Sequence, residues 1–270
     1  MTRPNPTFSL ARIYAMVLRH YYVLRGSWTR LLELAYWPTI QMVMWGFLTQ
    51  FLAANTSYIA QAFGVLLAAF LLWDLLFRSQ LGVSVSFLEE MWSRNLGHIF
   101  VSPLRPTELM VTLMVMSVIR TAIGLLPASF LAIAFYGYSI YSLGWPLLGF
   151  YLNLVFFGWG MGLAICGFLI RYGMGAESLA WLAGFIILPI SGIYYPIAVL
   201  PTWLQPVAWC LPSSYVFEGL RAAMVEGAAR WDLMAGAAAL NVLYVLGGGA
   251  CFLGFFRAAR QRGQLLQMGE

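Results

Sequence analysis

Three ionisable residues of this sequence lie inside apolar stretches, where charge is unusual. Asp74, Arg78 and Arg120 are each flanked on both sides by long runs of apolar residues. In hydrocarbon such groups are costly, so they are usually paired or line a polar path. Asp74 could pair with Arg120 on a neighbouring helix, or with Arg78 four residues along the same helix. We favour a structural ion pair that fixes helix register over direct contact with a ligand or a gate.

A polar interruption, EEMWSRNLGHIFVSPLRPTE at residues 89–108, is the second place where side-chain chemistry concentrates. Pro103 and Pro106 would stop a short helix, and Thr107 can cap the helix that follows. Taken alone, the segment either joins two long helices or offers charged side chains to a partner. The charged residues that a partner would contact are Glu89, Glu90, Arg94 and Arg105.

Patterns typical of an enzyme or a metal site are missing from the sequence. Cys166, Cys210 and Cys251 are scattered and the two histidines are far apart, which predicts neither a disulfide framework nor a metal site. No paired-carboxylate or Ser/His/Asp arrangement predicts a catalytic residue. All 15 basic residues are arginine, which excludes a Walker A loop because its lysine reaches the nucleotide phosphates. We expect a non-enzymatic chain that holds no cofactor.

The composition indicates an integral membrane protein. Of 270 residues, 61% are hydrophobic and 9% are charged, whereas about a quarter of a soluble domain is charged. Spans of about 20 apolar residues are needed to cross a bilayer. The predicted fold is all-α, in a single domain over residues 1–270 with a tail at 257–270. Six transmembrane helices are predicted at residues 34–54, 58–88, 109–135, 143–170, 178–195 and 233–256.

An amphipathic helix is predicted before the first span, at residues 10–32. At 100° per residue one face carries apolar side chains and the opposite face carries arginines. The apolar residues are Leu10, Ile13, Val17, Leu24, Trp28 and Leu31, and the arginines are Arg12, Arg19 and Arg30. We expect the apolar face to lie at the membrane interface and the arginines to meet anionic lipid headgroups. The alternative is a helix packed on a partner.

Arginine placement predicts the orientation, because cytoplasmic loops carry the basic excess. Eleven of the 15 arginines lie either before the first span or after the second, fourth or sixth span. These positions all fall on the same side of the membrane. Both termini and the segment 89–108 are therefore expected in the cytoplasm. The segment 196–230 is expected on the outer side.

That outer segment is apolar but rich in proline. Gly192 and Pro196 would end the fifth span, while Pro201 and Pro212 stand where two short helices would begin. We predict a re-entrant hairpin that dips into the outer leaflet and closes the outer end of a path as a gate. Its alternative is a loose loop that only joins two spans. In the second short helix, Glu218 and Arg221 are three residues apart and could pair and hold that helix against the last span.

Taken together, these features resemble the membrane subunit of ABC transporters of the type-2 exporter class, the ABC-2 permeases. The resemblance rests on the basic amphipathic helix, the loop at 89–108 and the stretch SGIYYPIAVLPTWLQPVAWCLPSSYVFEGLRAAM. The loop resembles the family's pattern through Glu89, Glu90, Gly97, Ser102 and Pro103. The later stretch resembles it through Gly192, Tyr195, Pro196, Leu200, Pro201, Pro212, Leu220 and Arg221.

The resemblance implies a permease that works with separate subunits. Two copies, as a homodimer, would join two ABC ATPase subunits that bind ATP and Mg, in a bacterial plasma (inner) membrane. The segment 89–108 would hold the coupling helix that docks on the ATPase. A bulky amphipathic substrate, such as a lipid-linked saccharide, a lipid or a hydrophobic drug, would move outward along a path lined mainly by the first, second and fifth spans. Candidate lining residues are Tyr36, Trp37, Trp45 and Phe47.

Two other classes of protein remain open from the residues alone. A stand-alone secondary transporter or channel could use Asp74, Arg78 and Arg120 as an ion or proton relay. A lipid-modifying membrane enzyme would need a nucleophile or base at an interface, and no convincing one is present. Membrane lipid is an expected partner, and nucleic acid is not.

Overall fold

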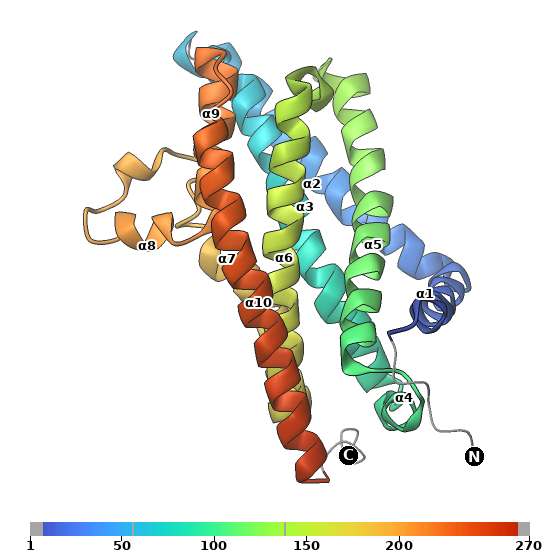
Figure 1. The fold of residues 1–270 in the computed structure, drawn as a ribbon. Coiled ribbons are helices and arrows are strands. Elements are labelled where there is room, and N and C mark those ends of the chain that lie inside the picture. Colours follow the sequence, from blue (N-terminus) through green and yellow to red (C-terminus); the bar gives the residue numbers. More distant parts are fainter. Residues whose placement is uncertain (1–7, 56, 138, 264–270) are drawn as a thin grey trace.

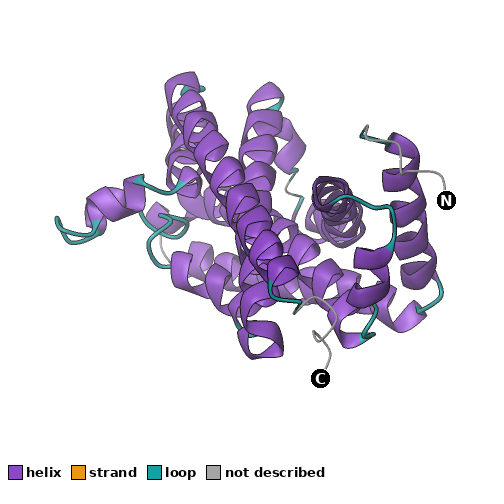
Figure 2. Cartoon of the chain, turned by 60° about the horizontal axis from the view of Figure 1, so that its bottom comes forward, coloured by secondary structure: helices purple, strands orange, loops and turns teal. Residues whose placement is uncertain are grey.

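The computed structural model of the chain describes residues 8–55, 57–137 and 139–263. Within these ranges the secondary structure is helical, without strands (Figure 2). The ten α-helices described are α1 (Leu10–Arg25), α2 (Trp28–Asn55), α3 (Ser57–Trp92), α4 (Leu96–Val101), α5 (Pro106–Tyr136), α6 (Trp145–Tyr172), α7 (Leu179–Ile187), α8 (Gln205–Trp209), α9 (Pro212–Arg221) and α10 (Trp231–Gln261).

Long apolar helices form the centre of the molecule. Among the described residues four helices are long and apolar enough to cross a membrane, at Gly64–Trp92, Pro106–Tyr136, Trp145–Ala176 and Trp231–Gln261. Helix α6 packs against both α3 and α10, and α3 also packs against α5 and α2. Figure 1 shows α4 and the C-terminal end of α10 at the same end of this bundle, with α1 beside the lower part of α5. The chain is a multi-pass helical membrane protein.

The N-terminal helix is shorter than predicted. One helix was expected over residues 10–32, but α1 ends at Arg25 and α2 begins at Trp28. Gly26 stands at the break, as glycine commonly does after the last turn of a helix. Arg30 therefore belongs to α2 and not to the amphipathic helix. Helix α2 is continuous through Asn55 although Pro38 lies inside it.

The helix ends on both sides of the segment 89–108 also differ from the predicted ones, so less of this segment lies outside the long helices. Helix α3 continues to Trp92, so Glu89 and Glu90 occupy its last turns and do not lie in a loop. Pro106 lies in the first turn of α5. Backbone N–H groups in a first turn have no acceptor within the helix, so the N–H that proline lacks is not needed there. Between them only the six residues of α4 form a helix.

The predicted fifth span, residues 178–195, contains a helix of nine residues, α7. At 1.5 Å per residue this helix covers about 14 Å, less than half of the hydrocarbon thickness. Turns follow α7 up to Tyr195, with Pro189 two residues beyond its end. Gly192 adopts the left-handed conformation, φ 68°, which glycine tolerates without strain. The helix thus ends earlier than the apolar pattern indicated.

The segment 196–230 forms short helical pieces beside the bundle. In place of a helix starting at Pro201 there is a 3₁₀ turn at Ile197–Val199, followed by α8, which has Pro206 in its first turn. Pro212 does begin α9, and a π-helical stretch, Ala222–Glu226, continues it. Helix α9 packs on α10 and α6. Figure 1 shows α8 projecting sideways from the bundle at about the middle of its height.

Close packing of α6 against α10 depends on glycine. A Cβ atom on Gly248 would overlap the carbonyl oxygen of Gly160 on the facing helix. Small residues at such contacts let membrane helices approach closely, which matters because apolar burial does not drive association in lipid.

Gly248→Ala should therefore destabilise the bundle, by about 1–3 kcal/mol as expected for overpacking. The neighbouring Gly247→Ala is the matched control, because a Cβ there meets open space. Melting of the purified full chain in detergent measures both variants. Equal melting temperatures for the two variants would show that the α6–α10 contact is not limiting.

Candidate functional site

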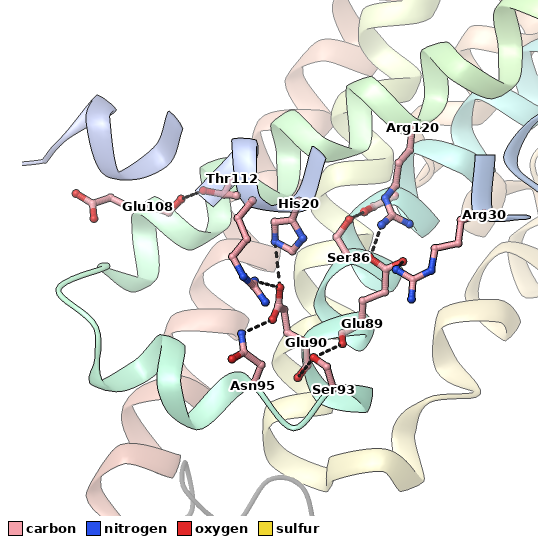
Figure 3. A network of polar contacts seen from close by, with 12 residues as sticks. His20, Arg30, Ser86, Glu89, Glu90, Ser93, Asn95, Glu108, Thr112 and Arg120 are labelled. Carbon is pink, nitrogen blue, oxygen red and sulfur yellow. Dashed lines mark hydrogen bonds and ion pairs between the residues drawn. The ribbon is translucent and has the colours of Figure 1, made fainter. Parts of the chain in front are cut away.

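The carboxylates around the segment 89–108 point toward the N-terminal helices, as the close-up in Figure 3 shows for Glu89 and Glu90. Glu90 is 3% exposed. Its carboxylate accepts hydrogen bonds from the Arg19 guanidinium and, at 2.7 Å, from Asn95 Nδ2. The Nε2 atom of His20 lies 3.5 Å from the same carboxylate. Glu90 therefore holds α1 against the end of α3.

Glu108, at the first turn of α5, makes the second attachment of α1. Its carboxylate accepts bonds from Arg12 Nε at 2.9 Å and Arg12 NH2 at 2.6 Å. The backbone N–H groups of Ser9 and Arg105 also donate to it, each at 2.9 Å. The hydrogen bond from Arg12 to Glu108 is the largest cause of a raised pKa at Arg12. The same bond, together with the backbone N–H groups of Arg105 and Ser9, lowers the pKa of Glu108 to about 2. The start of α1 is thus tied to the start of α5.

Glu89 makes the third attachment, to α2 and α5. Its carboxylate accepts a hydrogen bond from Arg120, and the Arg30 NH1 atom lies 3.5 Å away. Arg120 is therefore not the partner of Asp74, and of the two pairings left open by the sequence only the one along α3 forms. Arg78 Nε donates to Asp74 Oδ2 at 2.6 Å.

The arginines of the predicted amphipathic helix form ion pairs within the protein, which the sequence did not indicate. Arg12, Arg19 and Arg30 each pair with a carboxylate of α3 or α5, whereas they were expected to meet lipid headgroups. The reason is energetic, because a carboxylate removed from water is costly unless a cation and hydrogen bonds compensate it. The apolar face is divided as well, with Ile13 and Leu24 buried and Leu10 and Trp28 exposed.

His20 lies at the centre of this cluster of charges. It is 3% exposed, and its Nε2 atom has no hydrogen-bond partner. Burial lowers the pKa of His20, and the charges of Glu90, Arg19, Arg120 and Glu89 act on it in opposite directions. Burial therefore disfavours the protonated imidazole, which lies on α1 facing Glu90 of α3.

The opposite face of the same segment is exposed. Arg94 is exposed with φ 54°, the one non-glycine residue with positive φ among those the structure describes. Ser102 Oγ donates to the Ile99 carbonyl at 2.6 Å and accepts from Leu104 N at 3.3 Å, which ends α4 before Pro103. Exposed side chains on this face belong to Trp92, Ser93, Arg94, His98, Val101, Ser102 and Pro103. Gly97 and Arg105 are half-buried.

A second loop touches this face. Trp92 Nε1 donates to Glu177 Oε2 at 3.3 Å, and Glu177 follows the 3₁₀ turn Gly173–Ala176 between α6 and α7. The end of α3 and the connection after α6 therefore form one surface.

Glu218 and Arg221 on α9 hold the turn that follows α7. Glu218 Oε1 accepts from Ile197 N at 2.7 Å, and Arg221 donates to the carbonyls of Gly192 and, at 2.7 Å, Tyr195. The two side chains also lie 3.6 Å apart. They were expected to hold α9 against the last span, but α9 meets α6 and α10 through apolar side chains such as Phe217 and Leu220. The charged pair instead fixes the turn at 192–197, with Pro196 inside it.

Among the residues that the structure describes, no group of three or more histidine, cysteine, aspartate or glutamate side chains is placed to hold a metal ion.

The fold and this cluster define the class of protein: a helical, multi-pass membrane protein whose first helices are ion-paired to one end of its bundle. The model of one protein family, the ABC-2 type transporters, matches residues 13–225. The chain belongs to the ABC-2 type transporter family. No curated protein matches the chain.

The buried imidazole predicts a dependence of stability on pH. Because the folded state lowers the pKa of His20, the unfolded state binds the extra proton more readily, and acid favours unfolding. The melting temperature should therefore fall as the pH drops below about 6.5, and His20→Gln should reduce this fall. His98→Gln, on the exposed face of α4, is the matched control and should leave the pH dependence unchanged. An unchanged slope in His20→Gln would show that His20 is not responsible.

Proposed function

We propose that this chain is the membrane-spanning permease subunit of an ATP-driven ABC exporter. Two copies would form a homodimer with two separate ABC ATPase subunits, which bind ATP and Mg. The family match over residues 13–225 carries this proposal. The absence of lysine from the whole chain supports the division of labour, since a Walker A loop needs one.

In this assembly the chain would cross a bacterial inner membrane six times, with both termini in the cytoplasm. The four helices that are long and apolar enough to cross a membrane would supply four crossings. Helix α2, and α7 together with the turns after it, would supply the other two. The common end of α4 and of the last turns of α10 in Figure 1 fits a cytoplasmic side that carries the arginine-rich segments.

The exposed face of the segment 89–108 is our proposed contact with the ATPase. Arg94, His98, Val101, Ser102 and Pro103 would meet the ATPase, because their side chains are exposed. Glu90 would act indirectly, by fixing α1 to the end of α3. Glu89 would act in the same way on α2 and α5. ATP-driven movement of the ATPase subunits would then displace α4 together with α1, and so shift a two-state equilibrium of the bundle.

The substrate would be a bulky amphipathic molecule, moving between the two copies. Tyr36, Trp37 and Phe47 on α2 are exposed in the single chain, and suit a path or a second copy. Trp45 does not, because it stacks between Phe70 and Tyr194 at centroid distances of 5.9 and 5.1 Å. The pieces around α8 and α9 would close the outer end of the path as a gate.

A proton or ion relay through Asp74, Arg78 and Arg120 is less well supported. The three residues belong to two separate groups, since Arg78 pairs with Asp74 and Arg120 pairs with Glu89. A relay needs neighbouring groups that exchange protons, and arginine keeps its proton in proteins.

Reconstitution with an ABC ATPase partner tests the proposal. Arg94→Glu should weaken binding of the ATPase by about tenfold, a loss of about 1.4 kcal/mol in binding free energy. Permease-dependent ATP hydrolysis should fall as a result. Arg260→Glu reverses an exposed charge in the last turn of α10, outside the proposed contact, and is the control. The proposal would be wrong if the chain alone, without any ATPase, catalysed flux driven by an ion gradient.

A further inference from the structure

We propose that Arg78 is a positioning residue that replaces the backbone hydrogen bond missing at Pro38 and so fixes α2 against α3 at this position. The inference concerns the geometry of α2, α3 and α5, and holds whether or not the chain pumps a substrate. Only its consequence for a transport path along α2 rests on the proposed function.

Pro38 leaves a carbonyl without its usual donor. It lies buried inside the continuous helix α2. Proline has no backbone N–H, so the Leu34 carbonyl one turn earlier lacks the helical hydrogen bond. An unpaired backbone group is costly inside a membrane protein, and helices that contain proline recover the bond from neighbouring groups. Arg78 NH1, on α3, donates to Leu34 O at 3.1 Å.

Asp74 holds the guanidinium in the orientation that this bond requires. Asp74 is 4% exposed, and its carboxylate accepts from Arg78 Nε at 2.6 Å. The planar fork of arginine can meet a carboxylate on its own helix and a carbonyl on the next helix at once. The ion pair along α3 cannot by itself set the register between helices, since both partners lie on one helix. The bond to Leu34 can set it.

Helix α5 leaves room for this contact. Gly124 faces it, and a Cβ atom there would lie 2.9 Å from Leu34 O and 3.1 Å from Arg78 Cδ. The absence of a side chain lets α5 close over the bond between α2 and α3. Three helices therefore meet at the point where α2 lacks its own hydrogen bond.

A second bond holds α2 beyond the proline, and it provides a control. The Tyr136 hydroxyl donates to the Val43 carbonyl at 2.8 Å. Val43 is followed four residues later by Phe47, whose N–H is present, so this bond does not compensate for a proline. Loss of the Tyr136 bond should weaken α2 in a manner independent of Pro38.

Under the proposed function, the geometry of α2 around Pro38 sets where the exposed aromatic residues of α2 lie. Tyr36 and Trp37 precede the proline and Phe47 follows it. A change in the direction of α2 at Pro38 would move these two groups relative to each other. Arg78 would then shape the path without touching the substrate.

The test is a cycle of variants at the two positions in the purified full chain. Arg78→Lys keeps a charge beside Asp74 but loses the fork. It should lower the melting temperature by about 2–4 °C and speed hydrogen exchange locally in α2. Pro38→Ala restores the donor for Leu34. In the Pro38→Ala chain, Arg78→Lys should therefore lower the melting temperature by less than half as much.

Tyr136→Phe is the control in the same cycle, and its effect should be equal in the two backgrounds. Equal effects of Arg78→Lys with and without Pro38 would overturn the proposal, because Arg78 would then be only the counter-ion of Asp74. If Arg78→Lys alone fails to fold, folding of the Pro38→Ala, Arg78→Lys double variant supports the proposal. Failure of that double variant while Pro38→Ala folds contradicts it. Neither measurement uses an ATPase or a substrate, so the result is independent of the proposed function.

Discussion

Carboxylates that leave water must be compensated, and at one end of this bundle the compensation comes from arginines of α1, α2 and α5. Glu89, Glu90 and Glu108 lie where α3 ends and α5 begins, and each is paired with an arginine. Removing one member of such a pair is far more costly than the pair is stabilising, because it leaves a buried charge alone. Helix α1 is therefore part of the bundle's end.

The same requirement organises the interior and the turn after α7. Arg78 serves a carboxylate and a carbonyl near Pro38, and Arg221 serves two carbonyls in the turn after α7. In each place the chain leaves a helix irregular, and an arginine satisfies the groups that the irregularity exposes. Arginine suits this role because it keeps its charge and carries several donors in one plane. A chain whose 15 basic residues are all arginine is well matched to a fold that uses arginine in this way.

Sequence patterns predicted the long helices well and the charged contacts poorly. The predicted spans 109–135 and 143–170 lie close to α5 and α6 because apolar runs bounded by proline or glycine mark such helices clearly. The fifth span was overestimated, since the run beyond Ile187 is apolar but contains Pro189 and Gly192. The pairing of Arg12 with Glu108 joins residues 96 positions apart. Spacing along one helix carries no information on such a contact, although the matching charges of the two segments were visible.

The central claim is that ion pairs hold α1 to the end of α3, and a charge exchange between Arg19 and Glu90 tests it most directly. Hydrogen exchange of the α1 amides would be measured in the full chain. Fast exchange is expected for Arg19→Glu and for Glu90→Arg, with partial return of protection when both changes are combined. Full protection of α1 in both single variants would contradict it.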